Sequence, residues 1–291
     1  MAPRLPTHGI HTALVTPFLA DGELDLPAFE ALCERQITAG IHGLVPCGTT
    51  GETPTLSEDE QDTLLQIALT AADGQIPVTA GIGSNSTRAT VKNAERAQRL
   101  GADAGLMVFP FYNKPNPDGL RAHVRAVAAV GLPLVLYHVP GRTAQTLPAK
   151  LLAELSDIAG VVSVKEATGD LRYGTDVMAA TQRPILSGDD FSFLGLLAQG
   201  GTGCISVVSN VAPKHTVAIY DAFVGGELAE ARRILMDLWP LIGFLFTDSN
   251  PVPCKAAMAE LGLCRPEPRL PLASYSGPSP RALLEALGLL G

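Results

Sequence analysis

Short runs of apolar and β-branched residues recur along the chain, and each is followed by a segment whose apolar residues are spaced three or four positions apart. The runs have the length of strands, and the segments between them have the period of a helix. Eight strands are predicted in this way: Thr12–Thr16, Gly43–Cys47, Pro77–Ala80, Ala104–Val108, Leu134–Tyr137, Val161–Lys165, Ile185–Ser187 and Cys204–Val208. Continuous apolar strands that alternate with amphipathic helices indicate a parallel sheet covered by helices.

Helix starts are marked in the segments between these strands. Ser57 and Glu60 have the spacing of a capping box, and Asn116-Pro117 places a proline at a first helical position. From about Gly226 onward the pattern is helical only, and it predicts three helices: Glu227–Phe246, Pro253–Leu261 and Pro280–Leu290.

Eight strand–helix units in roughly 220 residues favour a closed (β/α)8 TIM barrel over an open, doubly wound sheet. The dinucleotide fingerprint of the open alternative is missing, because Gly81–Ser86 has two glycines in place but lacks the third. We therefore predict an α/β protein with a barrel domain over residues 1–225, which carries the active site, and a C-terminal helical region over 226–291.

Composition narrows the class of protein. The chain has 291 residues, 46% of them hydrophobic, and a net charge of -8, which argues against nucleic acid or an anionic membrane as a partner. No apolar run approaches the ~18 residues of a membrane-spanning helix, and the first eight residues lack the apolar stretch of a signal peptide. The five cysteines form no C-x-x-C pair. We expect a cytoplasmic protein with reduced thiols and no metal site.

Lys165 is the most informative single residue, because it ends an apolar run and is followed by the polar stretch Glu166–Asp170. In a parallel barrel its amine would lie at the carboxyl end of a buried strand, where the active sites of such folds are found. Burial favours the uncharged amine, which is the form that attacks a carbonyl to make a Schiff base. The alternative is a structural lysine that reaches solvent or pairs with Glu166. Lys255, in the helical region, is the second candidate amine.

Polar residues follow other predicted strands as well. Gly48–Glu52 follows the second strand, and its two glycines around two threonines offer backbone N–H groups and hydroxyls that suit a small carboxylate. Tyr112 follows the fourth strand, and Tyr137–Arg142 continues from the end of the fifth. Asp189 and Asp190 follow the seventh and are interpreted as carboxylates at a helix N-terminus rather than as metal ligands. Each residue alone has an ordinary structural explanation, but together they predict one site at one end of the barrel.

Four motifs carry a resemblance to a known family. They are Gly-Thr-Thr-Gly-Glu at 48–52, Tyr-x-Val-Pro-Gly-Arg-Thr at 137–143, Val-Lys-Glu-Ala-Thr-Gly at 164–169 and Asn-Pro-Val-Pro-Cys-Lys at 250–255. In this order and spacing, from about Ile10 to the C-terminus, the chain resembles the dihydrodipicolinate synthase/N-acetylneuraminate lyase family of class I pyruvate aldolases. Within it, the chain is most similar to the members that condense pyruvate with aspartate semialdehyde.

The resemblance implies a role for each matching residue. Lys165 would form an imine with the keto carbon of pyruvate, and the enamine derived from it would be the carbon nucleophile, without metal or coenzyme. Tyr137 would carry protons, linked through Thr49 to Tyr112 in a hydroxyl relay. Thr50 and the neighbouring amides would hold the carboxylate of pyruvate.

Gly188 and Ile205 are implied as further substrate-binding positions. The residue that matches Tyr112 enters the site of a neighbouring subunit in this family, so a homo-oligomer, either a dimer or a tetramer, is expected. Arg142 would hold the carboxylate of aspartate semialdehyde, since a guanidinium binds a carboxylate bidentately. His138 departs from the family, which usually has asparagine there, and strand alternation predicts that it faces away from the barrel interior.

Two alternatives remain at this point: a related aldolase or dehydratase that acts on another 2-oxo acid, and a non-catalytic pyruvate-binding homologue. The resemblance also bears on regulation, because many of the synthases are inhibited by lysine at a subunit interface. Asn85 matches the lysine-sensitive pattern. Where that pattern has a glutamate, this chain has Ala89. Where it has histidines, this chain has Glu58 and Gln61, and Phe111 replaces its tyrosine. We therefore expect weak or absent inhibition by lysine.

Overall fold

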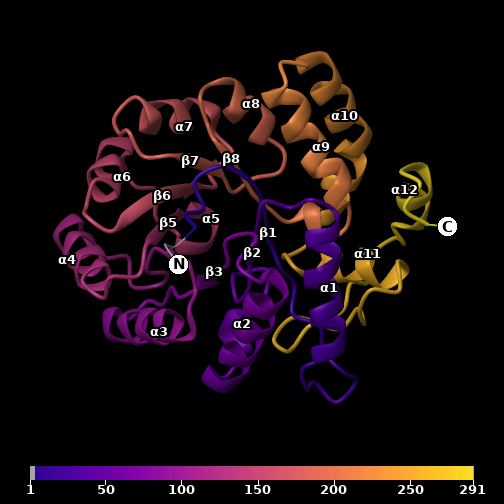
Figure 1. Cartoon of the computed structure of the whole chain (residues 1–291), viewed down its shortest axis with the longest axis horizontal. Coiled ribbons are helices and arrows are strands. Elements are labelled where there is room, and N and C mark those ends of the chain that lie inside the picture. The colour runs from indigo at the N-terminus through magenta and orange to yellow at the C-terminus, as the bar shows by residue number, and fades with distance from the viewer. Residues whose placement is uncertain (1–3, 291) are drawn as a thin grey trace.

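Eight parallel strands form a closed barrel at the centre of the molecule (Figure 1). The strands are β1 Gly9–Ala13, β2 Gly43–Val45, β3 Thr79–Gly81, β4 Ala104–Val108, β5 Leu134–His138, β6 Val161–Glu166, β7 Ile185–Ser187 and β8 Gly203–Ser206. They pair in the order β2-β1-β8-β7-β6-β5-β4-β3. The ring closes between β2 and β3, where the N–H of Leu44 donates to the carbonyl of Pro77 at 3.0 Å beside a parallel bridge to Val78. The fold is the (β/α)8 barrel that the sequence predicts.

This computed structural model describes residues 4–290; the first three residues and Gly291, at the outer ends of the two predicted domains, lie outside the described residues. The helices that follow the strands are α1 Leu26–Thr38, α2 Glu58–Ala72, α3 Thr87–Leu100, α4 Pro117–Ala128, α5 Pro140–Thr143, α6 Ala149–Ser156, α7 Leu171–Met178, α8 Phe193–Ala198 and α9 Pro213–Val224. Two 3-10 turns, η1 Thr53–Thr55 and η2 Val208–Asn210, lie at the carboxyl ends of β2 and β8. The capping box of Ser57 and Glu60 is formed, and Pro117 is the first residue of α4, both as predicted.

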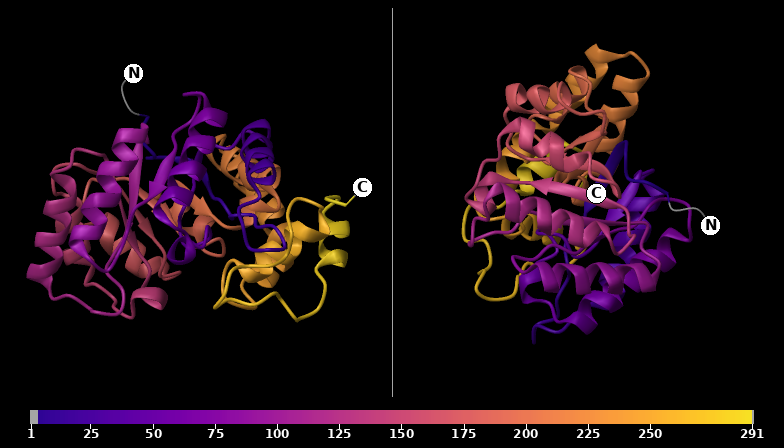
Figure 2. Two further views of the ribbon diagram at one scale, coloured as in Figure 1. Left: turned by 90° about the horizontal axis from the view of Figure 1, so that it is seen from below. Right: turned by 90° about the vertical axis from the view of Figure 1, so that its left-hand side faces the viewer.

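The chain ends in three further helices: α10 Leu228–Leu245, α11 Val252–Glu260 and α12 Arg281–Ala286. α10 packs against α9 and α11, and Figure 2 shows the last segment, in yellow, beside the barrel. α12 is shorter than predicted, because Gly288 takes a φ of 64°, in the left-handed region, and turns the chain.

Strand β8 ends two residues before its predicted end. The carboxylate of Asp190 accepts the backbone N–H groups of Val207 at 2.9 Å and Val208 at 3.1 Å, and the Ser206 hydroxyl at 2.6 Å. These bonds take the backbone out of the ladder and into the turn η2. The interpretation of Asp190 as a helix N-terminal carboxylate was therefore wrong: it is a buried cap for the end of a strand.

Strand β1 lies three residues earlier than predicted, at Gly9–Ala13 instead of Thr12–Thr16. Val15 is already outside the ladder, because its N–H donates to the side-chain oxygen of Asn210 at 3.2 Å. Strand β2 ends at Val45 instead of Cys47, since Pro46 has no N–H and Cys47 takes a φ of 56°.

The interior of the barrel is lined by a separate apolar cluster: Ala13, Val45, Ala104, Leu106, Val135, Tyr137, Val139, Leu186 and Ile205. A larger cluster fills the layer between strands and helices. Within residues 4–290, no helix combines the length and apolar character needed to cross a membrane. The cysteines are all free.

Candidate active site

The side chain of Lys165 lies inside the barrel at the carboxyl end of β6 and is 5% exposed. Its register partner on β5 is Tyr137, and its amine nitrogen lies 4.1 Å from the centre of the Tyr137 ring. Glu166, the alternative ion-pair partner of this lysine, is directed elsewhere, and its carboxylate accepts the N–H of Thr168 at 2.7 Å. The structure therefore places the amine on an apolar wall against an aromatic ring.

Gly188 and Ile205, two predicted substrate-binding positions, also lie inside the barrel near this end. A Cβ atom added to Gly188 would lie 2.7 Å from Cε of Lys165 and 2.6 Å from Cβ of Ala167, so there is no room for a side chain. Ile205 is 1% exposed and belongs to the interior cluster that contains Tyr137. Gly188 thus lies against Lys165, and Ile205 lies in the interior cluster that includes the register partner of Lys165.

The loop Gly48–Glu52 turns sharply after β2, and we call it the carboxylate loop. Cys47, just before it, has a φ of 56°, an uncommon conformation for a residue with a side chain. Thr49 is half-buried and Thr50 is buried. The Thr50 hydroxyl oxygen accepts a hydrogen bond from the side-chain amide of Asn250 at 2.9 Å. Because this contact uses a lone pair, the hydroxyl proton remains free to donate to a ligand.

Arg142 lies on the short helix α5, is exposed, and donates a hydrogen bond to the backbone carbonyl of Asn250 at 3.1 Å. Asn250 therefore links Arg142, which is expected to bind aspartate semialdehyde, to Thr50, which is expected to bind pyruvate. Sequence reasoning noted the motif that begins at Asn250 but gave this residue no role. Its partners lie 108 and 200 positions away along the chain, so only the folded structure reveals the contact.

Tyr112 is not assembled with the other predicted residues within one chain. It is 88% exposed, and its backbone φ of 71° holds it in the left-handed region. A tyrosine hydrogen-bonded inside a barrel site would be largely covered. The predicted relay of Tyr137, Thr49 and Tyr112 is therefore incomplete in the single chain, as the resemblance implies for a residue that a second subunit would cover.

The second candidate amine, Lys255 on α11, is unsuitable as a nucleophile. It is completely buried and forms an ion pair with Glu52, with its nitrogen 2.5 Å from the carboxylate oxygen. Its lone pair would become available only if this buried charge pair were broken. The geometry therefore favours Lys165 over Lys255.

His138 points to the outside of the barrel, as strand alternation predicts. It is fully buried between the rings of Phe109, 6.2 Å away between centroids, and Tyr173 on α7, 5.4 Å away. Burial lowers the pKa of His138 to about 4, so the imidazole is neutral. This departure from the family therefore packs behind the site and does not line it. Within residues 4–290, no group of three or more His, Cys, Asp or Glu side chains is arranged to hold a metal ion.

Comparisons with known proteins test the family resemblance. The model of the dihydrodipicolinate synthetase family matches residues 6–287. The chain belongs to this family.

Two similar relatives, both named 4-hydroxy-tetrahydrodipicolinate synthase, are from Geobacter sp. (strain M21) and Hyphomonas neptunium. The first is 46% identical over 91% of this chain and 92% of the relative, and the second is 45% identical over 98% of both. The crystal structure of dihydrodipicolinate synthase from Thermotoga maritima has 40% identity and a TM-score of 0.95, over 97% of this chain and 99% of that one. The family resemblance inferred from the four motifs is confirmed.

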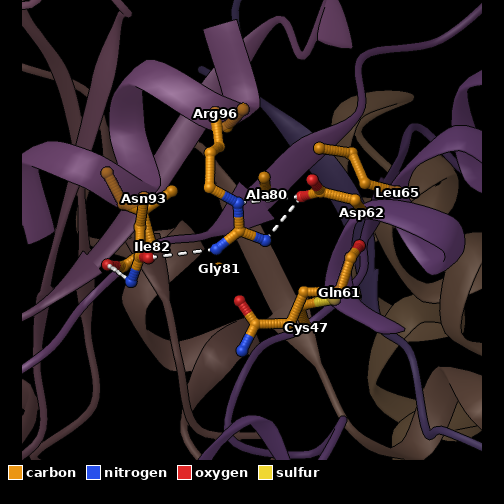
Figure 3. A pocket seen from close by; sticks show the side chains of 10 residues that line it. Cys47, Gln61, Asp62, Leu65, Ala80, Gly81, Ile82, Asn93 and Arg96 are labelled. Atoms are coloured by element: carbon orange, nitrogen blue, oxygen red, sulfur yellow. Dashed lines mark hydrogen bonds and ion pairs between the residues drawn. The ribbon is translucent and has the colours of Figure 1, made fainter. Parts of the chain in front are cut away.

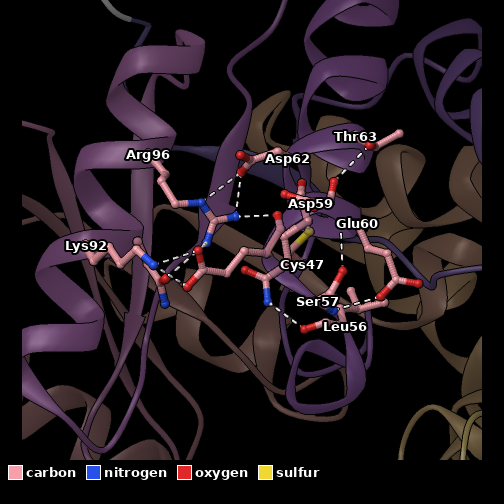
Figure 4. A network of polar contacts seen from close by, with 12 residues as sticks. Cys47, Leu56, Ser57, Asp59, Glu60, Asp62, Thr63, Lys92 and Arg96 are labelled. Atoms are coloured by element: carbon pink, nitrogen blue, oxygen red, sulfur yellow. Dashed lines mark hydrogen bonds and ion pairs between the residues drawn. The ribbon is translucent and has the colours of Figure 1, made fainter.

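A network of charged side chains joins α2 to α3 (Figure 4), the helices that carry Glu58 and Ala89, two of the positions compared above with the lysine-sensitive pattern. Glu58 is paired with Lys92 at 2.7 Å, and this pairing lowers the pKa of Glu58 below its usual value. Arg96, which is nearly buried, pairs with Asp62 at 2.5 Å and donates to the backbone carbonyl of Glu58 at 2.6 Å.

Arg96 and Asp62 line a small cavity together with Cys47 and Gln61 (Figure 3). Its volume of about 20 Å³ suffices for a single water molecule. The carboxylate of Glu58 is already paired with Lys92, so an added ammonium group would have to compete with this ion pair.

Proposed function

We propose that this protein is a 4-hydroxy-tetrahydrodipicolinate synthase, a lyase that condenses pyruvate with aspartate semialdehyde in the biosynthesis of diaminopimelate and lysine. The observation that carries the proposal is the position of Lys165, an amine 5% exposed on the apolar barrel wall and stacked on Tyr137. Membership of the family supports the same conclusion, because relatives with this name match nearly the whole chain.

Schiff-base formation at Lys165 is the first proposed step. The amine attacks the keto carbon of pyruvate, and loss of water from the resulting carbinolamine gives the imine. Loss of a methyl proton then gives an enamine, whose carbon attacks the aldehyde carbon of aspartate semialdehyde. Each of these steps moves a proton, and the Tyr137 hydroxyl is the group beside Lys165 that is suited to carry it.

Two carboxylates must be held during the condensation. The Thr50 hydroxyl and the backbone N–H groups of the carboxylate loop would hold the carboxylate of pyruvate, within the wall formed by Gly188 and Ile205. Arg142, at the mouth, would hold that of aspartate semialdehyde by charge-assisted hydrogen bonds. Its contact with Asn250 keeps the guanidinium on the same side of the site as Thr50.

We further propose that the protein works as a homo-oligomer, a dimer or a tetramer. Tyr112 is 88% exposed, which suits a residue that is covered by, and contributes to, the site of a second copy. A cytoplasmic location fits both the free cysteines and the metabolic substrates.

A condensation assay with purified protein tests the function. We expect product formation to require pyruvate and aspartate semialdehyde together, and replacement of pyruvate by 2-oxobutyrate to give much slower turnover. Equal or faster turnover with another 2-oxo acid would favour the related aldolase or dehydratase. Binding of pyruvate without turnover of any aldehyde would favour the non-catalytic homologue.

A further inference from the structure

A buried ion pair joins the carboxylate loop to the C-terminal helices. Glu52 is the last residue of that loop and is 3% exposed, and Lys255, on α11, is 0% exposed. The nitrogen of Lys255 lies 2.5 Å from Oε1 of Glu52. Charges in such positions cost desolvation energy, and removal of one partner alone leaves an uncompensated buried charge.

Both partners have further contacts that fix their positions. The second carboxylate oxygen of Glu52 accepts the backbone N–H of Arg269 at 2.8 Å, and the amine of Lys255 donates to the carbonyl of Glu267 at 3.2 Å. The ring of Phe18 lies 4.1 Å from the Lys255 nitrogen and 4.4 Å from the Arg269 guanidinium. We call Glu52, Lys255, Arg269 and Phe18 the Glu52 cluster.

The Glu52 cluster is anchored in turn to the barrel. The Arg269 guanidinium donates to the carbonyl of Thr55 and to the Glu60 carboxylate, each at 2.9 Å, and to the carbonyl of Gly22 at 2.7 Å. Because all three guanidinium nitrogens of Arg269 donate hydrogen bonds, the segment around it is held against the loops that follow β1 and β2. Rotation of Glu52 away from Lys255 would also break its hydrogen bond from the backbone N–H of Arg269.

The backbone of the carboxylate loop depends on these contacts. Glu52 has a φ of 57°, which a residue with a side chain adopts only when its surroundings impose it. Two residues earlier, Thr50 is held by Asn250, and the carbonyl of Gly51, between them, accepts the Thr16 hydroxyl at 2.7 Å. The C-terminal segment therefore contacts the loop at two positions: Asn250 binds Thr50, and Lys255 binds Glu52.

We infer that Glu52 and Lys255 are positioning residues for pyruvate: through their ion pair, the C-terminal helical region sets the shape of the loop that binds the pyruvate carboxylate. The inference rests on the proposed function, since it assigns the Gly48–Thr50 backbone to that carboxylate. Neither residue touches substrate. The pair acts by holding the Thr50 hydroxyl and the loop N–H groups where a carboxylate meets them together.

The test measures the pyruvate KM in variants of the ion pair. The variants are Lys255→Met, Glu52→Gln and the double substitution, in the full-length protein. Pyruvate KM is measured in the condensation assay and, independently, from the pyruvate concentration that gives half-maximal borohydride trapping. Met258→Ala is the matched control, because Met258 is fully buried on the same helix and its truncation weakens packing without changing the pair.

We expect each single substitution to raise pyruvate KM at least tenfold and to leave the KM for aspartate semialdehyde within twofold. Met258→Ala lowers the denaturation midpoint but leaves pyruvate KM within twofold. The double variant has no unpaired buried charge, so it regains stability relative to Lys255→Met while its pyruvate KM stays high. If Lys255→Met does not fold, Glu52→Gln, which keeps the side-chain volume, is judged by the same criteria.

A pyruvate KM in both single variants that matches the Met258→Ala control would overturn the inference and leave the proposed function intact. Recovery of the wild-type KM in the double variant would also overturn it, because the pair would then matter only as a source of unpaired charge. Wild-type protein that traps no pyruvate would remove the proposed function, and this inference with it.

Discussion

Replacement of His138 by leucine should make the protein less sensitive to mild acid. His138 is fully buried, neither ring nitrogen has a hydrogen-bond partner within the described chain, and burial lowers its pKa from 6.5 to about 4. The groups that face it are the rings of Phe109 and Tyr173 and, on the neighbouring strand, its register partner Glu166, whose own pKa is raised by burial. Burial is the cause of the lowered pKa of His138, and none of these groups forms a hydrogen bond with its imidazole.

The direction in which stability changes with pH follows from proton binding. Between pH 6.5 and 4 the unfolded chain binds a proton at His138 and the folded chain does not, so stability falls as the pH falls through this window. With these two pKa values the loss at His138 is about 2 kcal/mol at pH 5 and about 3 kcal/mol at pH 4, relative to pH 8. His11 is also buried with a pKa of about 4 and adds its own loss, but that contribution is common to wild type and variant.

Urea denaturation at pH 8 and pH 5 measures the effect as a difference between the two proteins. His138→Leu should lose about 2 kcal/mol less than wild type between these pH values. Replacement of the exposed His8 by glutamine is the control, and it should leave the wild-type difference unchanged. Equal losses in wild type and His138→Leu would refute the reasoning, because they would mean that the folded protein accommodates a charged imidazole at this position.

Three further predictions concern the site and its regulation. Gly188→Ala should lower the rate of borohydride trapping with pyruvate at least ~10-fold, because the added methyl group would overlap Cε of Lys165; trapping at the wild-type rate would show that the wall has room to yield. Arg142→Ala should lower kcat/KM for aspartate semialdehyde by about 10- to 100-fold, the value of a lost charged contact, with pyruvate trapping unchanged; an equal loss of trapping would show that Arg142 does not select the second substrate. Lysine at about 1 mM should leave the condensation rate unchanged, because Glu58 is already paired with Lys92; half-inhibition below that concentration, an affinity of about 4 kcal/mol, would contradict this.

The barrel could be predicted from the sequence because each strand is a short apolar run and each helix has its own period and cap. The neighbourhood of Lys165 followed from the same pattern, since parallel strands in register bring their carboxyl ends together. Three consecutive strands were predicted to end at or just before Tyr137, Lys165 and Gly188. The structure shows these residues side by side. The catalytic and binding roles assigned to them remain predictions.

The contacts that hold the site in place could not be predicted in this way. Asn250 meets Thr50 across 200 positions of sequence, and Arg269 meets Glu52 across 217, and neither contact follows from a local period. The end of β8 was misplaced for a similar reason, because the carboxylate of Asp190, which follows β7, accepts the backbone N–H groups that come after Ser206. Local pattern therefore predicts elements and their order, whereas the polar contacts that shape the loops depend on the closed fold.

The central claim is that Lys165 is the amine that forms the Schiff base with pyruvate. Treatment of the protein with pyruvate and sodium borohydride, followed by peptide mass mapping, tests it directly, with Lys165→Arg as the control. We predict loss of activity and a reduced pyruvyl adduct on Lys165 alone, with no adduct in the Lys165→Arg variant. An adduct on Lys255, or the absence of any pyruvyl adduct, would contradict the claim.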